Sequence, residues 1–96
     1  MYSKVYSVSC PSDKAEALMA YYDSETAKTV RESDHHVSHQ MIEVEAGSYL
    51  LVSNYKDQQA ADDAQTLVQK MITPLVERFG MRLEIIGAGE TIREIS

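Results

Sequence analysis

Three histidines lie close together near the middle of the chain: His35, His36 and His39. An unperturbed imidazole titrates near neutral pH, which makes it suited to general acid-base catalysis. Side chains alternate along a strand, so His35 and His39 are predicted to share one face and His36 to lie on the other. Two such groups are too few for a zinc or iron site. We therefore predict no metal site and take His39 as a candidate acid or base, the alternative being a solvated strand end.

Tyrosine dominates the aromatic residues, with six tyrosines, one phenylalanine and no tryptophan. A phenol donates a hydrogen bond to a hydroxylated or quinone-like ligand while its ring stacks on it. Tyr6 and Tyr55 lie in predicted strands, so we add them to His39 as candidate catalytic residues. The alternative is that they fill the core or an interface. Tyr21 and Tyr22 are expected to be packing or surface residues.

Two basic residues are candidates for substrate binding. Lys4 lies between Tyr2 and Tyr6 on one face of the first predicted strand, and burying its ammonium group under helices would be costly. That face is therefore expected to be the helix-free one, where Arg82 of the last strand would join Lys4 as an anion clamp. Ordinary charges at the rim of the protein are the competing interpretation.

Composition limits the classes of protein and partner. The chain has 96 residues, which fits one domain over residues 1–96, and its net charge of −6 opposes nucleic-acid binding. No apolar run reaches the ~18 residues that span a bilayer, and the first ten residues do not resemble a signal peptide. Cys10 is the single cysteine, so no internal disulfide forms. We expect a cytoplasmic protein without membrane or nucleic-acid partners.

The elements that position these residues follow from hydrophobic periodicity. Period-two segments predict four strands, and three- and four-residue steps predict two helices. We expect Pro74 to kink the second helix or to break it near Ile72, and we expect a bulge or bend at Gly87–Gly89. The predicted strands are Tyr2–Cys10, Asp34–Ala46, Tyr49–Tyr55 and one beginning at Met81, and the predicted helices run from about Asp13 to Ser33 and from Asp57 to Gly80.

This order, βαββαβ, predicts an α+β sandwich of the ferredoxin-like type, with a four-stranded antiparallel sheet and two helices on one face. Residues 49–52 are apolar at both alternating sets of positions, so this strand is expected to be buried on both faces. A second copy of the protein is the economical cover for the helix-free face. We predict a homodimer, with the reacting molecule between the two helix-free faces.

Two segments carry a resemblance to a known group of proteins. They are the strand and turn Tyr49–Asp57, with an aromatic residue followed by a helix-capping acid, and the helix end Pro74–Phe79. On these the chain resembles the dimeric α+β-barrel superfamily, and within it antibiotic biosynthesis monooxygenase-like proteins. The resemblance implies a dimer that encloses a barrel for a small organic molecule, and in some members oxidation of aromatic substrates without metal or flavin.

Residues 57–80 contain no histidine, which departs from both the monooxygenase-like and the haem-degrading members of that superfamily, and the chain lacks the tryptophan that the haem-degrading members also use. The resemblance therefore does not imply haem degradation, and it supplies no catalytic residue in the second helix. Two hypotheses for function follow. The first is a cofactor-independent, monooxygenase-like enzyme acting on an aromatic or quinone-like compound, with no cofactor. The second is a non-catalytic ligand-binding or interaction protein on the same fold.

Overall fold

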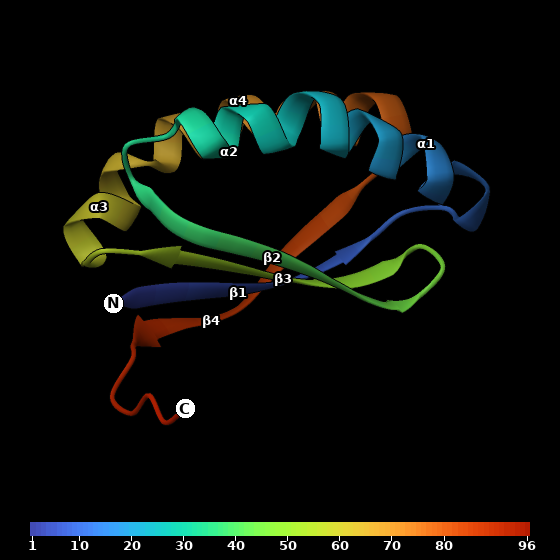
Figure 1. Ribbon diagram of the computed structural model, residues 1–96. Coiled ribbons are helices and arrows are strands. Elements are labelled where there is room, and N and C mark those ends of the chain that lie inside the picture. Colours follow the sequence, from blue (N-terminus) through green and yellow to red (C-terminus); the bar gives the residue numbers. More distant parts are fainter.

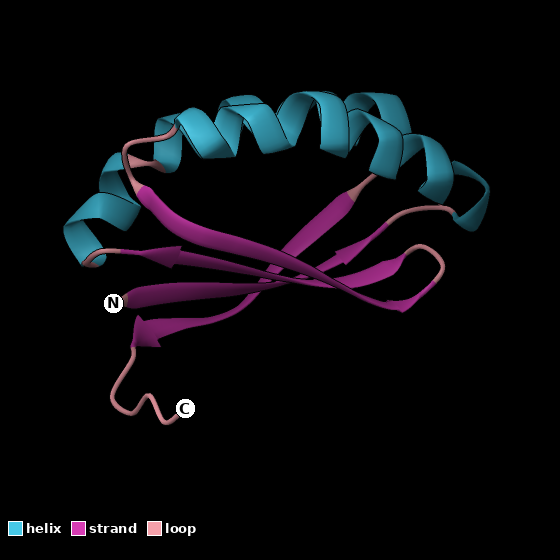
Figure 2. Ribbon diagram, viewed as in Figure 1, coloured by secondary structure: helices cyan, strands magenta, loops and turns pink.

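Four antiparallel strands form one sheet in the order β2-β3-β1-β4 in the computed structural model, which describes residues 1–96. They are β1 (Tyr2–Ser9), β2 (His36–Glu45), β3 (Ser48–Tyr55) and β4 (Arg82–Glu90). The helices lie together over one face of the sheet and leave the other uncovered (Figure 1 and Figure 2). The predicted sheet, with its helices on one face, is confirmed.

The central strands β1 and β3 pair along their whole length, from Tyr2 opposite Tyr55 to Ser9 opposite Ser48. Paired residues in a sheet point to the same face, and neighbours in sequence point to opposite faces. Val8 and Tyr49 are almost fully buried and pack against Leu18 of the helical layer. Even positions of β1 and odd positions of β3 therefore face the helices.

The first helical segment is continuous but not uniform. It consists of η1 (Ser12–Lys14), α1 (Ala15–Tyr21), the π-helical η2 (Tyr22–Thr26) and α2 (Ala27–Glu32). The predicted regular helix is therefore wrong in its middle. Leu18, Tyr22 and Thr26 recur every four residues, whereas an α-helix repeats every 3.6 residues and would rotate this series away from the sheet. The wider π turn keeps the series facing inward, with Leu18 and Thr26 buried.

The second helical segment is divided at Ala64 into α3 (Gln58–Asp63) and α4 (Gln65–Phe79). Asp57 caps α3 as predicted, because its carboxylate accepts a hydrogen bond from the Ala60 amide at 2.8 Å. Gly80 ends α4 in the left-handed conformation, with φ of 64°. The longest helix has 15 residues, and no helix is both long and apolar enough to cross a membrane.

The predicted break at Pro74 is wrong, since α4 continues through it. A proline inside a helix leaves the carbonyl four residues earlier without its donor. That residue is Lys70, which is exposed, so its carbonyl can be hydrated. Leu75 is buried against the sheet and Ile72 packs beside it, and this apolar contact holds both sides of the proline in one helix.

The predicted bend at Gly87–Gly89 is wrong, because β4 continues to Glu90, and the predicted bulge lies one residue before Gly87. Gly87 pairs with Val5 and Gly89 pairs with Ser3, and the irregularity lies instead beside Ile86, between the pairs formed by Tyr6 and Val5. A Cβ atom added at either glycine would meet nothing within 4 Å. The two glycines therefore leave this edge of the helix-free face without side chains.

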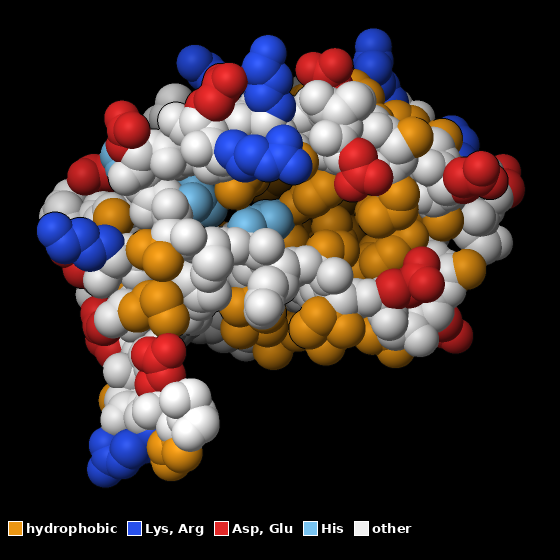
Figure 3. Space-filling model, viewed as in Figure 1, with side chains coloured by type: hydrophobic (Ala, Val, Ile, Leu, Met, Phe, Trp, Pro, Cys, Tyr) orange, Lys and Arg blue, Asp and Glu red, His pale blue; other side chains and the backbone are white.

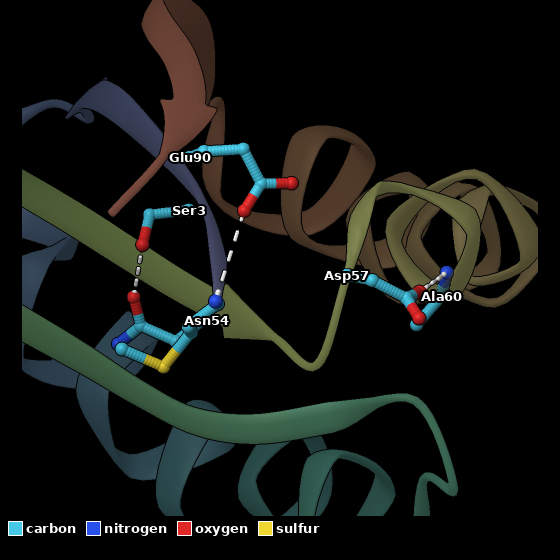
Figure 4. Close-up of polar contacts among 6 residues, drawn as sticks. Ser3, Asn54, Asp57, Ala60 and Glu90 are labelled. Carbon is cyan, nitrogen blue, oxygen red and sulfur yellow. Dashed lines mark hydrogen bonds and ion pairs between the residues drawn. The ribbon is translucent and has the colours of Figure 1, made fainter. Parts of the chain in front are cut away.

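Polar contacts fix the strand ends near the N-terminus. The Ser3 hydroxyl donates to the Asn54 side-chain oxygen at 2.5 Å, and the Asn54 amide donates to Ser38 at 2.8 Å, which links three strands. The Met1 amino group lies 3.7 Å from the Glu90 carboxylate (Figure 4). Beyond Glu90 the chain leaves the sheet, and residues 91–96 project away from it (Figure 1).

Candidate functional site

A cavity of about 40 Å³ lies between the sheet and the helices. Twelve of its 16 lining residues are hydrophobic. In Figure 3, histidine side chains border a hollow between the helical layer and the sheet, beside a group of hydrophobic side chains. Its polar groups come from the central strands β1 and β3, from the edge strand β2 and from the π turn: Tyr6, Tyr22, Thr26, His36, His39, Ser53 and Tyr55.

The three predicted catalytic residues, Tyr6, His39 and Tyr55, all line this cavity. The predicted location is wrong, because they lie under the helices and not on the helix-free face. Tyr6 and Tyr55 occupy positions of β1 and β3 that point toward α4, and His39 lies opposite Ser53 on β2. The prediction from sequence placed these three residues together, as the structure does. It assigned them to the wrong face of the sheet, because both alternating sets of β3 residues are apolar and either set could have faced the helices.

Both ring nitrogens of His39 have partners. Nε2 contacts the Tyr22 hydroxyl, and Nδ1 lies 3.0 Å from the Ser53 hydroxyl. Ser53 is buried on β3, and Tyr22 begins the π turn. One nitrogen of a neutral imidazole donates a hydrogen bond and the other accepts one, so the two hydroxyls hold the ring in place in either tautomer.

The environment of His39 favours the uncharged ring. Burial lowers the pKa of His39 below 6.5, because the surrounding apolar groups solvate an imidazolium poorly. No carboxylate lines the cavity to stabilise the charged form. At neutral pH His39 is therefore a free base whose two hydrogen-bonding sites are both directed by hydroxyl groups.

His36 joins His39 in the cavity, contrary to the predicted alternation. The pairing of β2 with β3 shifts between His36 and Ser38, so Val37 forms a bulge and both histidines face the helices. The His36 ring lies 4.7 Å from the Tyr55 ring, and its Nδ1 lies 2.8 Å from the Ser33 hydroxyl. Burial, and then the nearby His35, lower the pKa of His36.

The two predicted phenols have raised pKa values. Burial, and then the neighbouring Tyr55, raise the pKa of Tyr6 to about 12. Burial also raises the pKa of Tyr55, and a hydrogen bond with Ser53 partly offsets this. Both groups are therefore neutral hydrogen-bond donors at physiological pH and do not supply a base.

The predicted clamp of Lys4 and Arg82 is not formed. Lys4 lies on the helix side of β1, in a groove with Tyr6, Val68 and Ile85. Arg82 lies at the other end of the sheet opposite Ser9, in a groove on the helix-free side. Lys4 escapes the cost of burial because its strand lies beside an edge strand and the side chain is only partly covered.

Tyr22 and Ser53 were missed as site residues, although the sequence carried a signal for each. Tyr22 belongs to the apolar stripe of the first helix, which marks it as facing the sheet. Ser53 is a polar residue in the otherwise apolar series Tyr49, Leu51 and Tyr55, which marks a buried hydroxyl needing a partner. No group of three or more histidine, cysteine, aspartate or glutamate side chains is arranged to hold a metal ion.

No protein-family model matches the sequence, and no curated protein matches it. Solved structures do match. A dimeric ferredoxin-like protein from an uncultured marine organism superposes with a TM-score of 0.76 at 12% identity, over 100% of this chain and 99% of that one. This decides the architecture. The chain has the ferredoxin-like fold.

Two further structures with this ferredoxin-like fold carry names that refer to oxygenation. A Deinococcus radiodurans protein, provisionally named an antibiotic biosynthesis monooxygenase, gives a TM-score of 0.80 at 17% identity, over 100% of this chain and 97% of that one. SnoaB, a cofactor-independent oxygenase from Streptomyces nogalater studied as a mutant, gives 0.65 at 17% identity, with 97% of each chain covered. The resemblance to dimeric ferredoxin-like and monooxygenase-like proteins is thus confirmed for the fold.

Proposed function

We propose that the protein is a cytoplasmic homodimer that binds a small aromatic or quinone-like molecule between its sheet and helices, and oxidises it with molecular oxygen and no cofactor. The observation that carries the proposal is the neutral His39 held between Tyr22 and Ser53 in an apolar cavity. A base of this kind removes a proton from a phenol, and the electron-rich phenolate is the form that reduces oxygen. The oxygenase similar in fold adds support from outside this chain.

The reaction balances without a bound redox group. A phenol and O₂ give a quinone and water: one oxygen atom is added to a ring carbon, and the other leaves as water with the phenolic and ring hydrogens. The hydroxyl group of the phenol takes the place of the Tyr22 hydroxyl at Nε2 of His39, which accepts the phenolic proton and returns it to the departing oxygen. Tyr6 and Tyr55 stay protonated and donate hydrogen bonds to the developing quinone oxygens.

The cavity must enlarge to admit the ring. Its volume of about 40 Å³ accommodates only a few water molecules, whereas ligand sites span roughly 300–1,000 Å³. Three methionines line it, Met41, Met71 and Met81, and methionine side chains rearrange easily. Displacement of these side chains is the step that we propose opens the site. The small volume is also what favours the second candidate, a non-catalytic binding or interaction protein.

The homodimer is proposed from the helix-free face. Val5 pairs with Val52 and Ile42 pairs with Leu50, so an apolar band crosses three strands without a cover. Beside it, Gly87 leaves open space in which another backbone can approach closely. The dimeric ferredoxin-like structure of similar fold supports this arrangement.

Oxygen consumption with a panel of phenols and quinols tests the enzymatic proposal. We expect the wild type to use one O₂ for each quinone formed, and His39→Gln to lower kcat by about 100-fold or more. Tyr22→Phe should lower kcat less, because it removes one hydrogen bond to the base. Tyr21→Phe is the matched control, since Tyr21 packs on Phe79 outside the cavity. No turnover by the wild type would favour the non-catalytic candidate, and equal turnover by His39→Gln would show that His39 is not the base.

A further inference from the structure

A second hollow lies directly outside the candidate site. It is a groove of about 330 Å³ between α2 and β2, lined by Arg31, His36, His39 and four small or apolar residues. His36 and His39 line both this groove and the inner cavity. The two histidines therefore form the wall that separates the groove from the cavity, and a molecule can contact both spaces only beside them.

The groove carries one positive charge in a protein that is otherwise acidic. Arg31 lines it beside the uncharged rings of His36 and His39, and no carboxylate does, although the chain carries a net charge of −6. Arg31 forms no ion pair, because the one ion pair of the structure joins Met1 to Glu90. A guanidinium group presents two parallel donors that fit a carboxylate. The uncommitted charge beside the site thus matches an anionic group on the ligand.

From this placement we propose that the ligand is an aromatic acid, whose carboxylate binds Arg31 in the groove while its ring packs beside His36 and its hydroxyl group reaches His39 at the edge of the cavity. The inference rests on the proposed function and narrows its substrate class. His36 contributes a face for the ring, since it already packs against Tyr55 with the ring centres 4.7 Å apart. Val30 and Ala27 of α2 cover the other side of the groove with apolar surface.

The comparison of p-hydroxybenzoate with p-cresol tests the assignment, because the two differ only by a carboxylate in place of a methyl group. We expect the wild type to bind p-hydroxybenzoate about tenfold more tightly than p-cresol in a titration followed by NMR chemical shifts. Arg31→Gln should remove this preference and leave the affinity for p-cresol unchanged. Lys28→Gln, an exposed position of α2 outside the groove, makes the same change in net charge and should keep the preference.

The outcomes separate the two proposals. If the wild type binds both compounds equally, or if Arg31→Gln keeps the preference, the aromatic-acid assignment is wrong while the proposed binding site stands. If Lys28→Gln loses the preference as Arg31→Gln does, the effect is one of overall charge and the assignment is again wrong. If neither compound shifts resonances of cavity residues in the wild type, the proposed function falls and the assignment falls with it.

Discussion

The two faces of the sheet are built from the same strands, one residue apart, and they serve different purposes. On the helix-covered face, Ser53 and Tyr55 contribute a hydroxyl and a ring to a polar cluster inside an apolar cavity. On the helix-free face, their neighbour Val52 lies in an apolar band that carries no acid or base. The difference teaches that the proposed chemistry depends on one face and the proposed dimer on the other. Each face can therefore be changed separately.

Removing a core side chain on the helix-covered face should give the largest effect. Leu18 is fully buried against Val8 and Tyr49, so Leu18→Ala leaves a cavity and should lower the free energy of unfolding by about 2–5 kcal/mol. Urea denaturation measures the loss. Ile92→Ala, at a residue 78% exposed beyond the sheet, should change it by less than about 0.5 kcal/mol. Similar losses for both variants would show that the helical layer does not bury this face.

A charge on the helix-free face should break the proposed dimer and leave the fold intact. Ile42 is 48% exposed in one protomer and lies in the apolar band. Ile42→Lys would bury an unpaired ammonium at the interface and should raise the dimer Kd by about 100-fold or more. Sedimentation across micromolar concentrations measures this. Thr66→Lys adds the same charge to an exposed helix position and should not affect assembly. A wild type that stays monomeric would contradict the proposed dimer.

The contrast between the faces also explains what could be predicted from sequence. Period-two patterns identify strands reliably, because the pattern depends only on local alternation. They do not identify which face the helices cover when both sets are apolar, as at Leu50, Leu51 and Val52. Packing with distant residues decides which face the helices cover. The prediction from sequence could not include this packing, so it placed the candidate site on the wrong face.

The bulge in β2 and the π turn also made side-chain directions unpredictable from the sequence, each at one or two residues. The bulge at Val37 brings His36 to the side of His39, yet valine is as typical of a regular strand as of this bulge. The π turn at residues 22–26 directs Tyr22 to His39, and its only trace in the sequence is a four-residue repeat that α-helices also show. Single-residue shifts of this kind depend on tertiary contacts and leave no distinct local signal.

Protonating the site should give the smallest effect and the one most specific to the helix-covered face. The folded-state pKa values of His36 and His39 lie below the 6.5 of the free side chain, so the unfolded chain binds more protons as the pH falls. Their contribution to stability is therefore complete above about pH 6.5 and is lost as the pH falls toward the folded-state values, by at most about 1.4 kcal/mol per pH unit for each histidine.

Urea denaturation between about pH 7.5 and pH 5.5 measures this slope, above the range in which ordinary carboxylates titrate. The other titratable groups facing His39 in the cavity are His36, Tyr6, Tyr22 and Tyr55. Burial raises the pKa of Tyr6 and of Tyr55, so neither of these two phenols titrates in that range. His39→Gln keeps an amide in place of the ring and should flatten the slope, leaving the share due to His36. An unchanged slope in His39→Gln would mean that His39 is solvated in the folded protein, and the neutral base on which the proposed chemistry depends would not exist.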